Sequence, residues 1–265
     1  MGLVLDKDSS ALYEKWLQCP AGRSMDEFIH KIIPGLLSPQ KNDKILDIGC
    51  GTGNHLLLLN KLGLDISGVD ASPWMIDIAR RRLGNRCELK TGQAEDLPFS
   101  DNEFDIAFLI NTLEFLDDPL TALKEAGRVA RKKVFICVIN SLSLYCLVAR
   151  FQGLFRETLI RHIRPYHLWE MKSFIRNAYG SVPVVWNSMQ CQSPLKDGHN
   201  ALNTGTGRSF NWPFGSILGI SVTLNPLVRT ESLPLKFVVK KVEQPFAEGI
   251  TTQSQSSFKN NDYSA

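Results

Sequence analysis

The segment Ile45–Gly53, with the sequence ILDIGCGTG, constrains the fold of this chain more than any other stretch. It begins as an apolar strand and continues as a turn with glycine at the alternate positions Gly49, Gly51 and Gly53. Glycine lets the chain bend sharply and lets a ligand approach the backbone, because no Cβ stands in the way. A strand that enters such a turn and then a helix is typical of nucleotide-binding α/β folds.

The rest of the chain agrees with an α/β fold, because short β-branched runs alternate with helical stretches from Lys44 onward. The run 104–110 is apolar throughout, as in a strand that is buried on both faces. The predicted strands are 44–48, 65–69, 87–91, 104–110, 134–139, 182–186 and either 216–224 or 236–242. We therefore predict a doubly wound, mostly parallel, seven-stranded sheet with helices on both faces, which is a Rossmann-like fold.

Length and composition indicate an ordinary globular chain of 265 residues, of which 43% are hydrophobic and 22% charged. The formal net charge of +3 is too small to predict nucleic-acid binding. The six scattered cysteines form no CxxC pair, so neither a disulfide framework nor a metal site is predicted. We find no signal-peptide pattern and no run long enough to span a membrane, so we expect a cytoplasmic protein.

We expect one domain over residues 1–249. Within it, residues 1–43 are expected to form an N-terminal helical cover, broken near Pro20. Residues 141–166 are expected to form a lid-like insertion between the fifth strand and the next helix. Residues 250–265 lack core-forming side chains, so we expect a disordered tail there.

Two acids near the glycine turn indicate the kind of ligand. Asp70 ends the second predicted strand, where an acid can accept hydrogen bonds from both hydroxyls of a ribose. Asp47 precedes the turn, where it suits an ammonium group better than a pyrophosphate. A dinucleotide would favour the pattern GxGxxG, but position 54 is Asn54. S-adenosylmethionine, which carries an ammonium group and a ribose but no phosphate, is favoured over a nicotinamide dinucleotide.

Four segments, in their order and spacing, resemble the class I S-adenosylmethionine-dependent methyltransferases, especially the small-molecule group that includes ubiquinone and menaquinone biosynthesis enzymes. These segments are ILDIGCGTG (45–53), GVDAS (68–72), GQAEDLPFSDNEFD (92–105) and NTLEFLDDP (111–119). The resemblance covers about residues 10–140 strongly and the remainder weakly. It implies methyl transfer from S-adenosylmethionine to a small molecule. A catalytically silent relative that only binds the cofactor or a partner is the alternative.

The resemblance also implies cofactor-binding roles, residue by residue. The methionine part would lie against Asp47, the glycine turn and Asn111, and Asp70 would hold the ribose. The adenine would lie between the second strand's end and the segment 94–96. The implied set is Tyr13, Asp47, Gly49, Cys50, Gly51, Gly53, Asp70, Ala71, Met75, Ala94, Glu95, Asp96 and Asn111. A purely structural role stays open for Met75, as a core residue of its helix, and for Tyr13.

The sequence identifies no clear catalytic base. Many relatives carry a histidine after the fourth strand, where this chain has Glu114 and Phe115. The candidates are Glu114, His162 and His167. The two histidines are five residues apart, which does not suit a metal-binding pair on one helical face. No metal is predicted.

Three arginines, Arg156, Arg161 and Arg164, lie among apolar residues in the lid-like insertion. They could form the solvated face of an amphipathic helix. They could also hold the carboxylate or phosphate of an anionic, partly apolar acceptor, or contact a membrane surface. We therefore expect a small-molecule acceptor, no nucleic acid and no transmembrane segment, with peripheral membrane contact as an open alternative.

Overall fold

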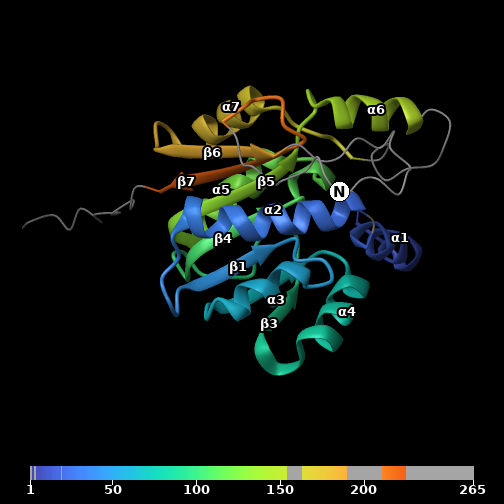
Figure 1. Ribbon diagram of the computed structural model, residues 1–265. Helices are drawn as coiled ribbons and strands as arrows, with labels where there is room; N and C mark the ends of the chain where they lie inside the picture. The colour runs from blue at the N-terminus through green and yellow to red at the C-terminus, as the bar shows by residue number, and fades with distance from the viewer. Residues whose placement is uncertain (1, 3, 19, 154–162, 190–210, 225–265) are drawn as a thin grey trace, which may run out of the picture. The chain divides into compact units, whose positions relative to one another are not determined.

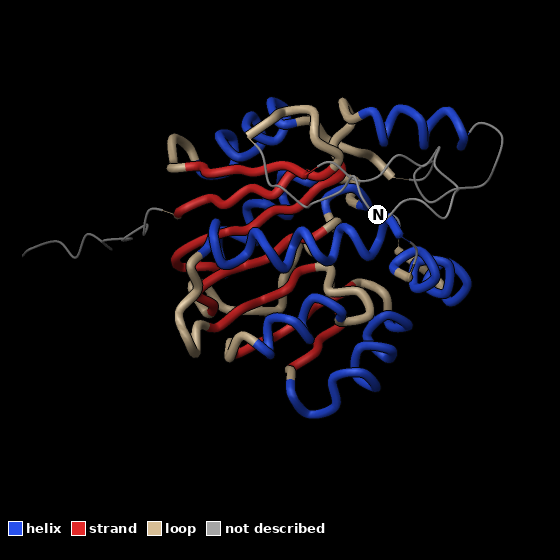
Figure 2. Tube along the Cα trace, viewed as in Figure 1, coloured by secondary structure: helices blue, strands red, loops and turns tan. Residues whose placement is uncertain are grey.

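A seven-stranded sheet forms the centre of this computed structural model, which describes residues 2, 4–18, 20–153, 163–189 and 211–224 (Figures 1 and 2). The strands are β1 (Lys44–Ile48), β2 (Asp65–Asp70), β3 (Glu88–Thr91), β4 (Phe104–Ile110), β5 (Ala130–Ile139), β6 (Val184–Met189) and β7 (Ile217–Thr223). Their order in the sheet is β3-β2-β1-β4-β5-β7-β6. β7 runs antiparallel to both of its neighbours, β5 and β6, and the other described strand pairs are parallel. The predicted mostly parallel sheet of seven strands is confirmed.

Helices cover both faces of the sheet (Figure 1). On one face, α5 (Pro119–Val129) and α7 (Leu168–Tyr179) contribute to a single apolar core. On the other face, α2 (Pro20–Leu37), α3 (Asn54–Lys61) and α4 (Pro73–Leu83) contribute to a second core. The remaining helices are α1 (Lys7–Leu17), α6 (Leu144–Gly153) and two short 3₁₀ turns, η1 (Gly84–Arg86) and η2 (Leu113–Phe115). The fold is doubly wound, as predicted.

Local sequence signals explain where several helices begin. The Ser72 side chain accepts a hydrogen bond from the Met75 N–H, and Pro73 occupies the first position of α4. The Asp118 carboxylate caps α5 in the same way, ahead of Pro119. These caps fix the helices that follow β2 and η2, and so fix the loops at the carboxyl ends of the strands.

The chain order of the strands reverses between β1 and β4, because β1 continues outward to β2 while β4 continues outward to β5. In open parallel sheets, ligands bind beside such a reversal, at the carboxyl ends of the strands. The glycine turn follows β1 and Asp70 ends β2. The topology therefore brings both features of the predicted site to this position.

Several element boundaries differ from the sequence predictions. β5 starts at Ala130 rather than at 134, because Ala130 already pairs with Phe104 across an irregularity in the ladder. β6 starts at Val184 rather than at 182, since Pro183 has no N–H to donate to a ladder. The last described strand is β7, within the predicted 216–224. The alternative strand 236–242, the tail 250–265 and residues 154–162 of the lid-like insertion lie outside the described residues.

The chain divides into two units, Met1–Pro226 and Leu227–Ala265, and every described element belongs to the first. Among the described helices, none combines the length and the apolar character needed to cross a bilayer.

Candidate cofactor-binding and active site

A cavity opens at the carboxyl ends of β1, β2 and β4. From the predicted cofactor-binding set, the cavity is lined by Tyr13, Gly49, Gly51, Asp70, Ala71, Met75, Ala94, Glu95 and Asn111. Asp47, Cys50, Gly53 and Asp96 do not line it. The structure thus gathers most of this set around one space.

The glycine turn needs glycine for two separate reasons. Gly49, Gly51 and Gly53 all have positive φ angles, of 73°, 52° and 78°, which side chains rarely adopt. At Gly49, an added Cβ would also lie 2.5 Å from the side chain of Thr112. At Gly51, the nearest atom to an added Cβ is 3.9 Å away, on Tyr13, so the backbone stays open to a ligand. The turn forms a cradle with accessible backbone.

Asp70 connects β2 to the glycine turn. One oxygen of its carboxylate accepts a hydrogen bond from the Gly51 N–H at 2.8 Å, and the other accepts one from the Ser72 N–H at 2.8 Å. Burial raises the pKa of Asp70, and these two hydrogen bonds oppose the rise. A carboxylate has about four acceptor sites. Asp70 therefore keeps the capacity to accept two hydroxyl donors from the cavity.

Two buried polar side chains at this end of the sheet have unsatisfied acceptors. Asp47 is 1% exposed, and neither of its carboxylate oxygens accepts a hydrogen bond from a described residue. Asn111 lines the cavity, and its side-chain oxygen likewise has no described donor. A buried acceptor without a donor costs free energy. An ammonium donor in the cavity would satisfy the Asn111 oxygen and would stabilise the charge of Asp47, which lies at the same end of the sheet. The residues present therefore fit the methionine end of S-adenosylmethionine.

The electrostatic character of the cavity also suits a cation. Asp70 and Glu95 are acids on its wall, and no described lysine or arginine lines it. Burial, followed by the charge of Asp70, raises the pKa of Asp47 to about 8. Burial raises the pKa of Tyr13 on the cavity wall, and four nearby carboxyl groups raise it further. A sulfonium or ammonium ion is stabilised in such surroundings, whereas a pyrophosphate is not.

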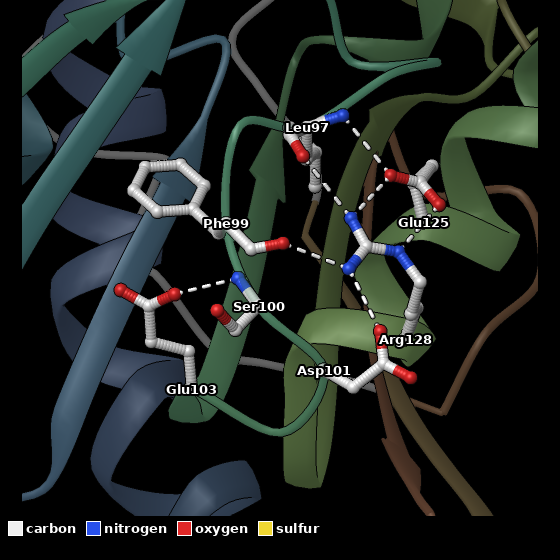
Figure 3. Close-up of polar contacts among 7 residues, drawn as sticks. All are labelled: Leu97, Phe99, Ser100, Asp101, Glu103, Glu125 and Arg128. Atoms are coloured by element: carbon white, nitrogen blue, oxygen red, sulfur yellow. Dashed lines mark hydrogen bonds and ion pairs between the residues drawn. The ribbon is translucent and has the colours of Figure 1, made fainter.

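Arg128 on α5 holds the loop that follows β3 (Figure 3). Its guanidinium donates hydrogen bonds to the carbonyl oxygens of Leu97, at 3.1 Å, and Phe99, at 2.8 Å. It also pairs with Asp101 at 2.9 Å and with Glu125 at 2.7 Å. Glu125 in turn accepts a hydrogen bond from the Leu97 N–H at 3.0 Å. This network fixes the loop whose first residues line the cavity.

The N-terminal segment closes part of the cavity, which sequence reasoning did not specify. Gly2, Val4 and Leu5 line the cavity beside Tyr13. The Leu5 carbonyl accepts a hydrogen bond from the Ser72 hydroxyl at 2.6 Å. The apolar residues ahead of the first helix were the available signal in the sequence. The other unpredicted lining residues all lie within the four segments that resemble the methyltransferases. They are Ile48, Val69, Gly92, Gln93, Thr112, Phe115 and Leu116.

A second contact joins the helical cover to the glycine turn. The Arg82 guanidinium donates hydrogen bonds to the Thr52 carbonyl and hydroxyl, both at 2.9 Å, and to the side chain of Asn54. It also forms an ion pair with Glu14 of α1 at 2.9 Å. Arg82 therefore links α1, α4 and the turn that follows β1.

The candidate bases are placed away from the cavity wall. Glu114 is buried, and one of its carboxylate oxygens accepts a hydrogen bond from the Ile139 N–H at 2.7 Å. Burial raises the pKa of Glu114 to about 7. The His167 side chain caps α7 by accepting a hydrogen bond from the Glu170 N–H at 3.2 Å. His162 lies outside the described residues, and neither of the other two lines the cavity.

Among the three arginines proposed for acceptor binding, the structure describes only Arg164. Its guanidinium forms an ion pair with Glu170 at 2.7 Å and lies over the ring of Tyr166. Arg156 and Arg161 lie outside the described residues. Within the described ranges, no group of three or more His, Cys, Asp or Glu side chains could hold a metal ion.

Residues 46–138 match the family described as methyltransferase domain. The O-methyltransferase resE of Aspergillus sclerotiorum is 34% identical over 131 residues, which are 45% of this chain and 50% of that protein. A sterol 4-C-methyltransferase of Caenorhabditis elegans is 29% identical over 118 residues, which are 42% of this chain and 35% of that protein. The chain thus spans about half, or less, of the length of these relatives.

A solved structure shares the fold. It is an S-adenosylmethionine-dependent methyltransferase of Thermotoga maritima, described as a possible histamine N-methyltransferase. The TM-score is 0.61 at 23% identity, over 81% of this chain and 96% of that one. Residues 46–138 therefore match a methyltransferase domain, and the chain shares the fold of this solved methyltransferase.

Proposed function

We propose that the protein transfers a methyl group from S-adenosylmethionine to a small-molecule acceptor by in-line displacement. The observation that carries this proposal is the cavity beside β1 and β4. Asp70, the last residue of β2, lines this cavity. Among the described residues, the wall of the cavity contains acids but no lysine or arginine. A ribose, an ammonium group and a positive sulfur all match such a wall.

Each part of the cofactor has a counterpart among the residues. Asp70 would accept hydrogen bonds from the ribose hydroxyls. The backbone of the glycine turn, Asn111 and Asp47 would surround the methionine part. The adenine would lie among Ala71, Met75, Ala94 and Glu95. When bound, S-adenosylmethionine supplies a methyl group that its positive sulfur has already activated.

The protein's own contribution would be alignment and exclusion of water. Holding two reactants in line replaces much of the entropy cost of their encounter. Val4, Leu5, Phe115 and Leu116 form an apolar part of the wall that would keep water from the methyl group. A proton acceptor is needed only where the acceptor must lose a proton. Neither Glu114 nor His167 lines the cavity, so we assign this role to neither of them.

The apolar part of the wall favours an acceptor that is at least partly apolar. The two curated relatives above are named for methylation of an oxygen and of a sterol carbon, which is consistent with a small-molecule acceptor. Arg164 is already paired with Glu170. Arg156 and Arg161 stay our candidates for holding an anionic acceptor.

Transfer of label from methyl-labelled S-adenosylmethionine tests this proposal. The protein would be incubated with phenols, sterols, carboxylic acids and amines, each analysed by mass spectrometry. We expect at least one acceptor to gain the labelled methyl group and the Asp70→Ala variant to lose most of this activity. Cofactor binding without transfer to any acceptor would instead indicate a catalytically silent binding module.

A further inference from the structure

The described surface has one large concentration of exposed apolar side chains. Ten large apolar side chains are exposed in the described part of the chain, and six of them come from residues 142–147, 169 and 212–214. These six are Leu142, Leu144, Leu147, Trp169, Trp212 and Phe214, and we call them the exposed apolar face. Contiguous exposed apolar surface of this kind commonly marks a site of interaction.

Ring contacts and hydrogen bonds bring these segments together. The ring of Phe214 lies 5.4 Å from that of Trp212 and 6.4 Å from that of Trp169, measured between ring centroids. The Asn140 side chain donates hydrogen bonds to the carbonyl oxygens of residues 213 and 215, at 2.8 and 2.7 Å. Its oxygen accepts one from the Leu142 N–H at 3.1 Å. The start of α6 and the loop before β7 are thus one surface.

Helix α6 has apolar side chains on both of its sides. Cys146 is buried, whereas Leu144 and Leu147, three residues apart, are 62% and 56% exposed. Over residues 144–147 of α6, apolar side chains thus lie both on the buried and on the exposed side of the helix. None of the six residues of the exposed apolar face lines the cavity, so the proposed cofactor site does not account for them.

The distribution of charged residues on and beside this face indicates which kind of partner it could bind. Residues 140–148 and 211–216 contain no charged residue. On α7, Lys172 and Arg176 are exposed at three and seven residues from Trp169. The single acid of α7, Glu170, is paired with Arg164. The result is an uncharged aromatic and leucine surface that is flanked by cations.

We propose that the exposed apolar face docks on the surface of an anionic lipid bilayer. Tryptophan suits the boundary between headgroups and acyl chains, because its ring is apolar and its N–H is polar. Trp169, Trp212, Phe214 and the leucines of α6 enter this boundary. Lys172 and Arg176 lie against the lipid phosphates, as on other interfacial basic surfaces. This proposal does not depend on the cofactor or on the acceptor.

Co-sedimentation with vesicles tests the proposal on the full chain. Vesicles of phosphatidylcholine mixed with phosphatidylserine would be compared with vesicles of phosphatidylcholine alone, at low and high salt. We expect the parent protein to sediment with the anionic vesicles, and more strongly at low salt because ions screen the attraction. Lys172→Gln/Arg176→Gln should remove the preference for anionic lipid.

Two variants on different elements probe the apolar contact. Trp169→Ala/Trp212→Ala/Phe214→Ala and Leu144→Gln/Leu147→Gln should each weaken vesicle binding by about tenfold or more, since about 1.4 kcal/mol changes affinity tenfold. The matched controls are Trp74→Ala and Leu62→Gln, whose side chains are 50% and 42% exposed on other elements. Both controls should bind as the parent does. Thermal melting identifies any variant that fails to fold.

The proposal is wrong if the parent stays in the supernatant with every vesicle, or if folded variants of both kinds bind as the parent does. It is also wrong if the parent forms dimers in sedimentation velocity, the variants of the face are monomers, and no protein binds vesicles. In that case the face joins two copies of this chain.

Discussion

The Asp70 carboxylate accepts a hydrogen bond from the backbone N–H of Gly51 at 2.8 Å, and so joins the end of β2 to the turn that follows β1. The acid proposed to hold the ribose and the turn proposed to hold the methionine part are therefore one unit. A change in the turn should weaken cofactor binding even where the acid itself is untouched. This relationship sets the first prediction.

Gly49→Ala should weaken binding of S-adenosylhomocysteine by about tenfold or more, measured by calorimetry. An added Cβ meets Thr112 at 2.5 Å, and the φ angle of 73° disfavours any side chain. Gly63→Ala is the matched control, with a φ angle of 75° but with its nearest contact 3.8 Å away, on Lys41. It should cost roughly 1–2 kcal/mol of stability through backbone strain, with the affinity unchanged. Equal affinity losses in both variants would contradict the prediction.

Cofactor affinity should rise with pH through Asp47. The pKa of this buried carboxyl is raised to about 8, so most of it is protonated at pH 6. A bound ammonium group favours the ionised form, and binding should therefore release a proton below pH 8. Calorimetry in two buffers with different ionisation enthalpies measures that proton. Asp47→Asn should show a flatter pH dependence and less proton release, and an unchanged profile would argue against contact with the ammonium group.

The same carboxyl should lower the stability of the cofactor-free protein as pH rises. Its folded pKa, about 8, lies above the unfolded value of about 3.9, so the folded state binds more protons between these values. The free energy of unfolding must then fall as pH rises from about 4 to about 8. Glu114, with a pKa near 7, acts in the same direction. Urea unfolding of the parent and of Asp47→Asn isolates the contribution of Asp47, which should be absent in the variant.

Arg128→Ala should lower the free energy of unfolding by about 2–3 kcal/mol, because it removes several charge-assisted hydrogen bonds to one loop. It should also weaken S-adenosylhomocysteine binding, since that loop begins at the cavity wall. Arg80→Ala removes an exposed pair with Asp77 and should change stability by no more than about 0.5 kcal/mol. Unfolding in urea compares the two. Similar small effects would mean that the Arg128 network does not hold the loop.

The half of the fold that forms the cavity could be predicted because local signals determine it. The glycine turn, the caps at Ser72 and Asp118 and the continuous apolar run of β4 each constrain a few neighbouring residues. Parallel strands then bring their carboxyl ends to one edge of the sheet. These steps do not require knowledge of contacts between residues that are distant in the chain.

The remaining features depend on distant contacts or on details of loop geometry. The Leu5 carbonyl accepts a hydrogen bond from Ser72, 67 residues later, and this distant contact helps to place the N-terminal segment at the cavity. Asp96 was predicted to line the cavity, because it belongs to the segment 94–96. Instead, its N–H donates a hydrogen bond to the Gln93 carbonyl in a tight turn, and its side chain is exposed. Arg164 is engaged by Glu170, which no pattern of apolar residues indicates.

The central claim is that this cavity holds S-adenosylmethionine through Asp70, and titration calorimetry with S-adenosylhomocysteine tests it most directly. The parent protein should bind one equivalent, and Asp70→Ala should bind about tenfold more weakly or worse, since each hydrogen bond to a charged group contributes about 1.5–3 kcal/mol. Asp65→Ala, at the exposed start of β2, should bind as the parent does. Absence of binding to the folded parent, or equal affinity in a folded Asp70→Ala protein, would contradict the account.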